Sequence, residues 1–330
     1  MRRSILVGYD ARAADPAPVE FGSEMARLTG ASLVIGCVQA GAPALPMNPG
    51  GVQPYAIAQP DADLLPDCTP ALRRVESQLS MRGIKYDCVK LESTSAARAL
   101  QEEAERDGAA MLVVGSSRRA GSRRVAAGST GERLLHGAPC PVDVVPRGWT
   151  ARATVSTIGV AWTDSEEARE ALRAAWALAR RVGAELRAFT VVRETLQMRM
   201  EAEPRIKEGQ LGRDVIDVLG EHKLYALMKL EEEAAALGGE VPVTTEAFEG
   251  DPAEVLVDLS RGVDLLVLGS RGYGPLRSVL LGSVSRRVMA KAHCPVSVLP
   301  RGVKAPLDAL LEETKARARP AAPRPATTAG

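Results

Sequence analysis

The sequence predicts an α/β protein built from two tandem domains, each a five-stranded, mostly parallel sheet with helices on both faces. Three observations lead to this fold class. The chain repeats itself at a nearly constant interval, strands alternate with helical patterns in each repeat, and several strands are apolar throughout. Continuous apolar runs are typical of parallel strands covered on both faces, and regular alternation of strand and helix favours a parallel sheet.

The repeat is visible in two pairs of segments. LVVGSS at 112–117 corresponds to LVLGSR at 266–271, and CPVDVVPRG at 140–148 corresponds to CPVSVLPRG at 294–302. Both pairs are offset by 154 residues, and the strands that open the copies are offset by 153. A constant offset over most of the chain indicates two copies of one domain. We place the first domain at 1–148 and the second at 153–302.

The elements of each copy follow in one order. An apolar strand opens it (SILVGYD or STIGVAW), and a helix follows that ends at Gly30 or Gly183, because glycine just past a helix is the usual left-handed cap. Two more strands come next, ASLVIGCV and KYDCVKL in the first copy, AELRAFTVV and VPVTTEAF in the second. Helices at about 95–107 and 252–261 then lead into AAMLVVG and VDLLVLG.

The last strand of each copy, VDVVP or VSVLP, leaves a free edge. We expect these two edges to pair and to join the copies about a pseudo-two-fold axis. Two segments depart from the repeat. The Pro/Gly-rich segment 41–61 is predicted to be a loop after the second strand, and the Ala/Pro/Arg-rich segment 303–330 is predicted to be a disordered tail.

Composition excludes several classes of function. Charged residues make up 25% of the chain, the net charge is +1 and aromatic residues are 3%, which argues against a nucleic-acid partner. No run of 18 apolar residues occurs, so no membrane-spanning helix is predicted. Five cysteines without a C-x-x-C pair argue against a disulfide framework or a zinc site. We therefore expect a reduced, cytoplasmic protein.

The segment GSRGYGPLRSVLLGS at 269–283 is the strongest candidate for a ligand site. Its glycines allow positive φ and a close approach of the backbone to a ligand. The helix that follows presents free N–H groups and a dipole that suit a phosphate, and the hydroxyls of Ser283 and Ser285 can donate to phosphate oxygens. The alternative is a glycine-lined turn with a serine N-cap and nothing bound.

The spacing Gly269-x2-Gly272-x9-Gly282-Ser283 resembles the glycine motif of the ATP-binding universal stress proteins. The resemblance also covers HCPVSVLP, GDPAEVLVDL and the opening strands, and it spans nearly the whole chain twice. It implies a Rossmann-like (adenine nucleotide alpha hydrolase-like) fold that binds an adenine nucleotide in each half. ATP is the implied ligand, with Mg²⁺, AMP and ADP left open.

The resemblance also implies which residues bind the nucleotide. A carboxylate after the first strand faces ribose or adenine, the residue that ends the second strand offers backbone hydrogen bonds to adenine, and the glycine motif takes ribose and phosphates. The implied residues of the second copy are Thr163, Val191, Gly269, Gly272, Gly282, Ser283, Val284 and Ser285. Those of the first copy are Asp10, Val38, Gly115, Gly128 and Ser129.

The two copies depart from the motif in complementary ways. The first keeps Asp10 but has Arg118 at the second glycine position, where a side chain either blocks the pocket or pairs with phosphate. The second keeps its glycines but has Thr163 in place of the aspartate, with Asp164 beside it. Thr163 can hydrogen-bond a ribose hydroxyl without a charge. We therefore expect the second copy to be the better site.

Other candidates for chemistry are weaker. His136, His222 and His293 occupy non-equivalent places and are interpreted as solvated or capping residues. Cys140 and Cys294 are equivalent and are expected to pack as small hydrophobes, with redox sensing as the alternative. The arginine cluster at 118–124 is interpreted as a solvated loop that contacts phosphate or an acidic partner only in the alternative view.

The resemblance thus implies a nucleotide-dependent regulator of a stress response, with an adenine nucleotide and an unidentified protein as partners. Two other functions stay open: a protein-interaction module that has lost nucleotide binding, and a slow ATP hydrolase. No catalytic residue or metal ligand is assigned. A homodimer beyond the internal repeat also stays open.

Overall fold

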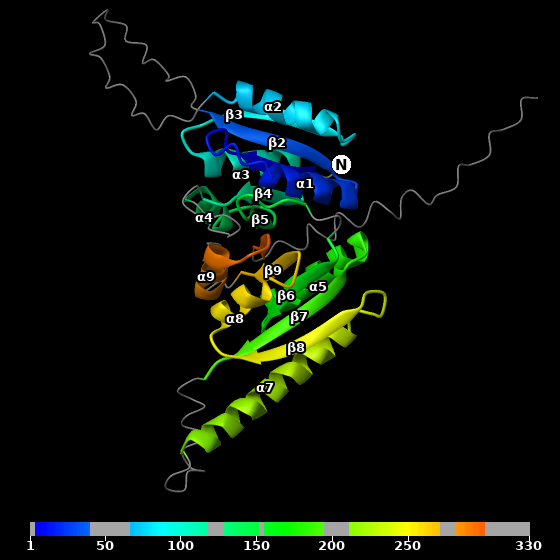
Figure 1. The fold of residues 1–330 in the computed structure, drawn as a ribbon, viewed down its shortest axis with the longest axis vertical. Coiled ribbons are helices and arrows are strands. Elements are labelled where there is room, and N and C mark those ends of the chain that lie inside the picture. The colour runs from blue at the N-terminus through cyan, green and yellow to red at the C-terminus, as the bar shows by residue number, and fades with distance from the viewer. Residues whose placement is uncertain are drawn as a thin grey trace, which may run out of the picture.

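The two halves of the chain form one continuous ten-stranded sheet in the order β3-β2-β1-β4-β5-β10-β9-β6-β7-β8 (Figure 1). The computed structural model describes residues 4–39, 67–117, 129–151, 155–194, 211–270 and 282–300. The segment 41–61, the tail 303–330 and the positions of Arg118, Gly128 and Gly272 lie outside the described residues.

The first half holds five strands and four helices within the described residues. They are β1 (Ser4–Tyr9), α1 (Ala17–Thr29), β2 (Ser32–Gln39), α2 (Thr69–Ser80), β3 (Tyr86–Glu92), α3 (Ala96–Asp107), β4 (Met111–Gly115), α4 (Ser129–Leu135) and β5 (Val142–Val145). The second half repeats this series. It comprises β6 (Thr157–Trp162), α5 (Glu166–Val182), β7 (Glu185–Val192), α7 (Leu211–Ala235), β8 (Val243–Glu249), α8 (Pro252–Leu259), β9 (Leu265–Gly269), α9 (Ser283–Lys291) and β10 (Val296–Leu299).

Within each half all strand pairs are parallel, and the strand order reverses beside the first strand. β1 pairs with β2 on one side and β4 on the other, and β6 pairs with β7 and β9 in the same way. Ligands of open α/β sheets bind beyond the carboxyl ends of the strands at such a reversal. The predicted five-stranded parallel sheets are therefore confirmed, and the topology fixes where a site would lie.

The halves join through one antiparallel strand pair, as the sequence predicted. β5 and β10 pair with Val144 opposite Val296 and with Asp143 opposite Ser297. Since each half is otherwise parallel, its carboxyl edge points away from that of the other half. A hydrogen bond of 2.8 Å from the Arg181 guanidinium on α5 to the Thr29 carbonyl at the end of α1 adds a second link between the halves.

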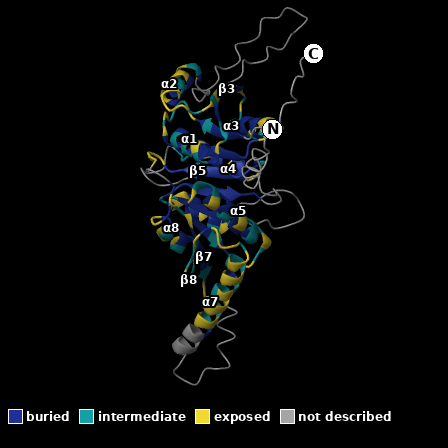
Figure 2. Cartoon of the chain, turned by 90° about the vertical axis from the view of Figure 1, so that its right-hand side faces the viewer, coloured by how far each residue is buried: buried dark blue, intermediate teal, exposed yellow. Residues whose placement is uncertain are grey.

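Helices cover both faces of the sheet, and the strands between them are buried (Figure 2). Side chains of α1, α2, α5 and α7 pack in one apolar cluster against one face. Side chains of α3, α4, α8 and α9 pack in a second cluster against the other. The strands carry fully buried residues in both clusters, among them Ile5 and Leu6. This explains why their sequences are apolar throughout rather than alternating.

Two predictions about helix ends are confirmed. Gly30 and Gly183 adopt φ values of 74° and 73° just past α1 and α5, the left-handed conformation that glycine takes without strain. Helices α2 and α7, by contrast, were not assigned from the sequence. The apolar stripe of α2 consists only of Leu72, Val75 and Leu79, a short signal that follows the Pro/Gly-rich segment.

In this structure one pair of cysteines is oxidised, contrary to the expectation drawn from the cysteine count. Cys37 on β2 and Cys68 at the start of α2 form a disulfide across a sequence separation of 31 residues. Sequence spacing does not reveal such a pair, because the two residues meet only when α2 packs on the sheet. Cys140 and Cys294 are free and buried, and they pack in the apolar cluster as expected.

A buried carboxyl group lies in the strand pair that joins the halves. Asp143 is fully buried, and neither of its oxygens forms a well-oriented hydrogen bond with the described residues. Burial raises the pKa of Asp143 to about 7, and the hydroxyl of Ser297 offsets part of that shift. The pKa shifts upward because a buried carboxylate charge without full hydrogen bonding is costly, which favours the neutral form.

Asp143 should make stability depend on pH. Its pKa in the folded protein, about 7, exceeds the ordinary value of 3.8, so the folded state retains a proton that the unfolded chain releases. Its contribution to stability is present below about pH 4 and is lost as the pH rises toward 7. Asp143→Asn should remove this loss, so its melting temperature should exceed that of the wild type at pH 8. Asp87→Asn, at an exposed position of β3, is the control, and equal pH profiles for Asp143→Asn and wild type would contradict the expectation.

Candidate functional site

The loops after β1 and β6 carry the polar residues predicted to face ribose. Asp10 directly follows β1, is exposed, and accepts a 2.9 Å hydrogen bond from the Arg12 backbone N–H. In the same loop Ala14 takes a φ of 46°, a conformation that costs a non-glycine residue free energy. In the second half Thr163 is partly buried and lies 3.4 Å from the Ser165 hydroxyl, oxygen to oxygen. Asp10 and Thr163 thus occupy equivalent places after the first strand.

Val38 and Val191 direct backbone groups into the space beyond the first strands. Successive residues of a strand direct their peptide groups to opposite neighbours. The carbonyls of Gln39 and Val192 accept 3.0 Å bonds from the outer strand side, from the N–H groups of Ser93 and Gly250. The preceding residues, Val38 and Val191, therefore face the side of β1 and β6.

Those neighbouring strands end too early to pair with Val38 and Val191. The last register pairs are Tyr9 with Cys37 and Trp162 with Thr190. The carbonyls of Val38 and Val191 thus lie one residue past the paired region in each half. In this geometry the backbone groups of Val38 and Val191 are free of strand pairing, so the edge of a planar base could reach them.

Gly269 lets the end of β9 approach the backbone of α5. A Cβ atom at Gly269 would lie 2.8 Å from the Glu167 carbonyl oxygen, closer than real Cβ contacts allow. The equivalent Gly115 faces a side chain instead, since a Cβ there would lie 2.9 Å from Cγ of Pro18 on α1. Neither glycine takes a positive φ. Positive φ is therefore wrong as a reason for Gly269, where the constraint is the close approach of the protein's own backbone.

The amino end of α9 has no side-chain cap. Its N-cap is Gly282, with a φ of −59° and no side-chain capping hydrogen bond, as is also the case for α1 and α2, whereas Ser95, Ser165 and Asp251 cap α3, α5 and α8. The alternative of a serine N-cap is therefore wrong, because the chain begins this helix at Ser283 itself. The first-turn N–H groups of an uncapped helix are available to an anion.

Two serines near that helix end are buried. Ser285, in the first turn of α9, is 7% exposed, and Ser270, directly after β9, is fully buried. The Ser270 hydroxyl has no hydrogen-bond partner within the described residues, whereas the equivalent Ser116 hydroxyl donates a 2.8 Å bond to the Val145 carbonyl. Ser270 was not among the sequence-predicted residues, and its burial is visible only in the fold.

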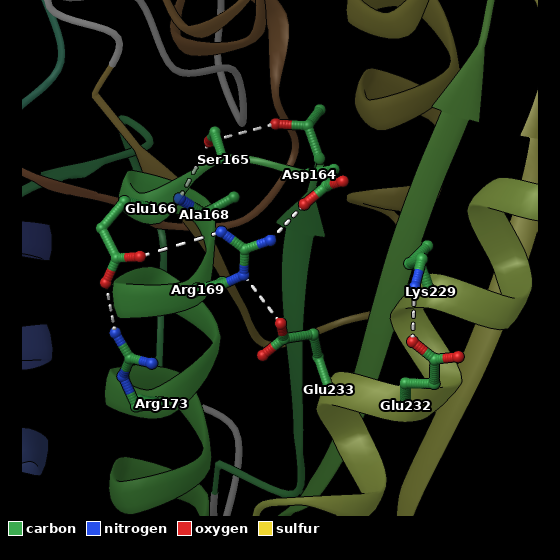
Figure 3. Close-up of polar contacts among 10 residues, drawn as sticks. Asp164, Ser165, Glu166, Ala168, Arg169, Arg173, Lys229, Glu232 and Glu233 are labelled. Carbon is green, nitrogen blue, oxygen red and sulfur yellow. Dashed lines mark hydrogen bonds and ion pairs between the residues drawn. The ribbon is translucent and has the colours of Figure 1, made fainter.

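An ion-pair network fixes the residue beside Thr163 (Figure 3). Arg169 on α5 pairs with Asp164, and its Nε donates a 2.7 Å hydrogen bond to Glu233 on α7. Its third carboxylate neighbour is Glu166, at 3.7 Å. Asp164 is half exposed, and its carboxylate points to Arg169 rather than standing free beside Thr163. The role of Asp164 is thus to link the β6–α5 loop to α7 through Arg169.

A second network, not singled out from the sequence, fixes α9 beside α8. Arg287 on α9 bonds Asp251 at 2.8 Å and Glu254 at 3.1 Å, and Lys291 bonds Glu254 at 3.2 Å. The hydrogen bond from Arg287 lowers the pKa of Asp251, the N-cap of α8, and Lys291 lowers the pKa of Glu254. The sequence signal that could have identified the start of α8 is GDPAEVLVDL, where Asp251 precedes a proline at the first helical position.

The fold brings most of the predicted residues to one edge in each half. The carboxyl ends of β2, β1 and β4 are neighbours, which places Val38, Asp10 and Gly115 together. Those of β7, β6 and β9 place Val191, Thr163 and Gly269 together. Helix α9, which leads into the parallel strand β10, begins at this same edge with Ser283, Val284 and Ser285. Ser129 begins α4 in the first half.

A cavity of about 370 Å³ lies elsewhere, where the end of β5 meets the start of β9. Its lining includes Trp149, Arg261, Asp264 and His293. Two of its polar groups are already bonded, since Asp264 accepts from the Ser156 backbone at 2.8 Å and the His293 N–H donates to the Ser260 hydroxyl. None of the residues predicted to bind the nucleotide lines this cavity.

These features define the class of the protein: a tandem pair of doubly wound α/β domains with an uncapped helix end and backbone groups at the strand-order reversal. The family model of the universal stress proteins matches residues 1–146 and 154–300. The chain belongs to the universal stress protein family, and the sequence-based resemblance is confirmed.

Relatives support the same conclusion over shorter stretches. The chain is 38% identical to universal stress protein MJ0531 of Methanocaldococcus jannaschii over 92 residues, 27% of this chain and 53% of that protein. It is 40% identical to universal stress protein Rv1996 of Mycobacterium tuberculosis over 72 residues, 22% of this chain and 23% of that protein. The chain thus spans about half or less of the length of these curated relatives.

Solved structures support the fold of the whole chain. A universal stress protein from Archaeoglobus fulgidus is 19% identical, with a TM-score of 0.61, over 92% of this chain and 100% of that one. Protein PA1789 from Pseudomonas aeruginosa is 17% identical, with a TM-score of 0.60, over 95% of this chain and 97% of that one. Within the described residues, no helix is long and apolar enough to cross a membrane.

The close approach of Gly269 predicts a destabilising substitution. Gly269→Ala places a Cβ against the Glu167 backbone carbonyl, which cannot rotate away, so the free energy of unfolding should fall by about 1–3 kcal/mol. Gly220→Ala in α7 is the matched control, because nothing lies within 4 Å of its added Cβ. Denaturant unfolding measures both, and equal stability of Gly269→Ala and wild type would contradict the close contact.

Proposed function

We propose that the chain is a cytoplasmic, nucleotide-dependent regulator of a stress response that binds an adenine nucleotide at the carboxyl edge of each domain. The domains are taken as 1–148 and 153–302, and ATP is the preferred nucleotide. Membership of the universal stress protein family supports the proposal. Occupancy is proposed to alter the loops at the strand ends and so the surface offered to a protein partner.

The observation that carries the proposal is a set of unused hydrogen-bond donors at one strand edge, namely the amino end of α9 and the Ser270 hydroxyl after β9. The helix of nine residues lacks a side-chain cap, and the buried Ser270 hydroxyl has no partner in the described part of the chain. Buried hydroxyls are normally hydrogen-bonded, and free first-turn N–H groups suit phosphate. The donor chemistry at this edge therefore fits a nucleotide.

The residues of the second copy divide into three roles. Backbone groups of Val191 bind the adenine edge, and the Thr163 hydroxyl binds ribose. The N–H groups of Ser283, Val284 and Ser285 bind phosphate, where a side chain at Gly282 would intrude. In the first copy Val38 and Asp10 have the corresponding roles. A nucleotide held in this way changes the charge and the order of the adjoining loops.

The second copy is proposed as the stronger site. Its glycine motif is complete, whereas the first copy has Arg118 in place of the second glycine. Its contact with ribose is proposed to be the weaker part of the site, because Thr163 carries no charge and Asp164 is paired with Arg169. That same ion pair favours a second candidate, a protein-interaction module without nucleotide, for which added ATP·Mg²⁺ should leave the melting temperature unchanged.

Gly282→Glu tests the phosphate position. A glutamate at the N-cap of α9 places negative charge where phosphate is proposed to bind, while a carboxylate at a helix start preserves the helix. ATP binding to the second copy should be lost, with the melting temperature kept within a few degrees of wild type. Isothermal titration calorimetry measures the binding.

Gly239→Glu is the matched control for Gly282→Glu. Gly239 is exposed, and nothing lies within 4 Å of an added Cβ, so the same charge is added away from the site. This variant should bind ATP like the wild type. Unchanged ATP affinity in Gly282→Glu would place the nucleotide elsewhere.

Thr163→Asp tests the ribose position by a gain of affinity. A carboxylate in place of the Thr163 hydroxyl forms a charge-assisted hydrogen bond with ribose, so the Kd for ATP should fall by about 5-fold. Thr244→Asp, at an exposed position of the edge strand β8, is the control. Weaker ATP binding in Thr163→Asp than in Thr244→Asp would contradict the assignment of ribose to this loop.

A further inference from the structure

The disulfide between Cys37 and Cys68 joins an outer helix to the candidate site of the first copy. Cys37 is in β2, two residues before its end, and Cys68 is the N-cap of α2. Both side chains are buried, at 1% and 0% exposure. Beside the bond, the Cys68 N–H donates a 3.4 Å hydrogen bond to the side-chain oxygen of Gln39. The bond therefore fixes the start of α2 to the carboxyl end of β2.

Little else holds α2 on the sheet. Only Leu72, Val75 and Leu79 are buried among its twelve residues, whereas α1 buries nine of thirteen. Its polar links to β3 are the surface bond of 2.6 Å from the Lys90 ammonium to the Thr69 hydroxyl, the surface contact of Ser80 with Tyr86, and a partly buried 3.3 Å bond from the Tyr86 hydroxyl to the Glu76 carbonyl. A helix with a small buried surface detaches at a low free-energy cost, so the covalent bond accounts for a large share of its attachment.

The second copy has no counterpart of this bond. The residue equivalent to Cys37 is Thr190, which is buried on β7 opposite Trp162. Helix α7, which takes the place of α2, has 25 residues and is tied to α5 by the bond from Arg169 to Glu233. The disulfide is therefore a property of the first copy alone, and the second copy serves as an internal control.

We propose that Cys37 and Cys68 form a redox-controlled link that docks α2 onto β2 and sets the nucleotide affinity of the first copy. The coupling to affinity rests on the proposed function, because Val38, whose carbonyl is assigned to adenine, directly follows Cys37. The closed link holds this strand end in register with β3. Reduction of the disulfide loosens the carboxyl end of β2 and weakens nucleotide binding by the first copy.

The chemistry is reversible thiol–disulfide exchange. When local opening of α2 exposes the bond, a thiolate of a dithiol attacks one sulfur, the other sulfur leaves as a thiol, and the second thiol of the reductant resolves the mixed disulfide. The protein gains two electrons and two protons as two thiols, and the dithiol becomes a disulfide. A low-molecular-weight disulfide of the glutathione type reverses the exchange. In a reducing cytoplasm the thiol form is the resting state, and oxidation closes the link.

Cys88 on β3 provides a matched control on the same face of the sheet. It is free and partly buried, and it packs against the same apolar cluster. Burial, together with Glu76 on α2, raises the pKa of Cys88 to about 12. Its thiol therefore stays protonated at neutral pH and does not exchange with the disulfide.

The test compares the full-length protein after treatment with oxidised glutathione and after treatment with dithiothreitol. Amide hydrogen exchange of 69–80, measured by mass spectrometry, should accelerate by about 10-fold on reduction. Cys68→Ser should exchange like the reduced protein under both conditions, and Cys88→Ser should follow the wild type. Exchange in α7 should not change.

A second measurement isolates the nucleotide affinity of the first copy. In the Gly282→Glu background, the Kd for ATP should rise by about 5-fold on reduction, or equally in Gly282→Glu/Cys68→Ser. If the amides of α2 are equally protected from hydrogen exchange in both redox states, the redox-controlled link is overturned. If their protection changes but the Kd for ATP does not, the coupling of the link to the nucleotide site is overturned. If ATP binds this background in neither state, nucleotide binding by the first copy is refuted, and α2 exchange still decides the link.

Discussion

The antiparallel pairing of β5 with β10 is the contact on which the arrangement of the molecule depends. It converts two parallel five-stranded sheets into one sheet, leaves β3 and β8 as the outer edges, and directs the two carboxyl edges to opposite sides. The pairing also buries Asp143 opposite Ser297. A buried, incompletely bonded carboxyl group is costly, so the stability of this strand pair is expected to depend on pH.

Within each half the geometry of the candidate site follows from the early ends of the first strands. Because β1 and β6 stop at Tyr9 and Trp162, the peptide groups of Val38 and Val191 lie beside an unpaired space. The halves then diverge in what surrounds it. The first has a carboxylate at Asp10 and a covalently attached outer helix, whereas the second has an α9 without a side-chain cap and an Arg169 network that engages Asp164. One fold thus presents two candidate edges with different surroundings.

Most of the fold could be predicted from the sequence, because its cause is local or repeated. The sequence shows the offset between the copies, the apolar strands and the capping glycines Gly30 and Gly183. It also predicts that the last strand of each copy has a free edge. The disulfide of Cys37 with Cys68 could not be predicted, since it depends on where α2 packs. For Gly269 the expected positive φ is wrong, and the constraint that the fold reveals is the Glu167 carbonyl. Ser270 and Arg169 acquire their roles only through tertiary contacts.

The central claim is that the candidate edges bind an adenine nucleotide, with the second copy dominant. The most direct measurement is to denature the freshly purified protein and to identify and count the released nucleotide by mass spectrometry. The account predicts about one adenine nucleotide per chain, held by the second copy at its higher affinity. A protein that releases none, and that also fails to bind added ATP, would contradict the account and favour the protein-interaction module.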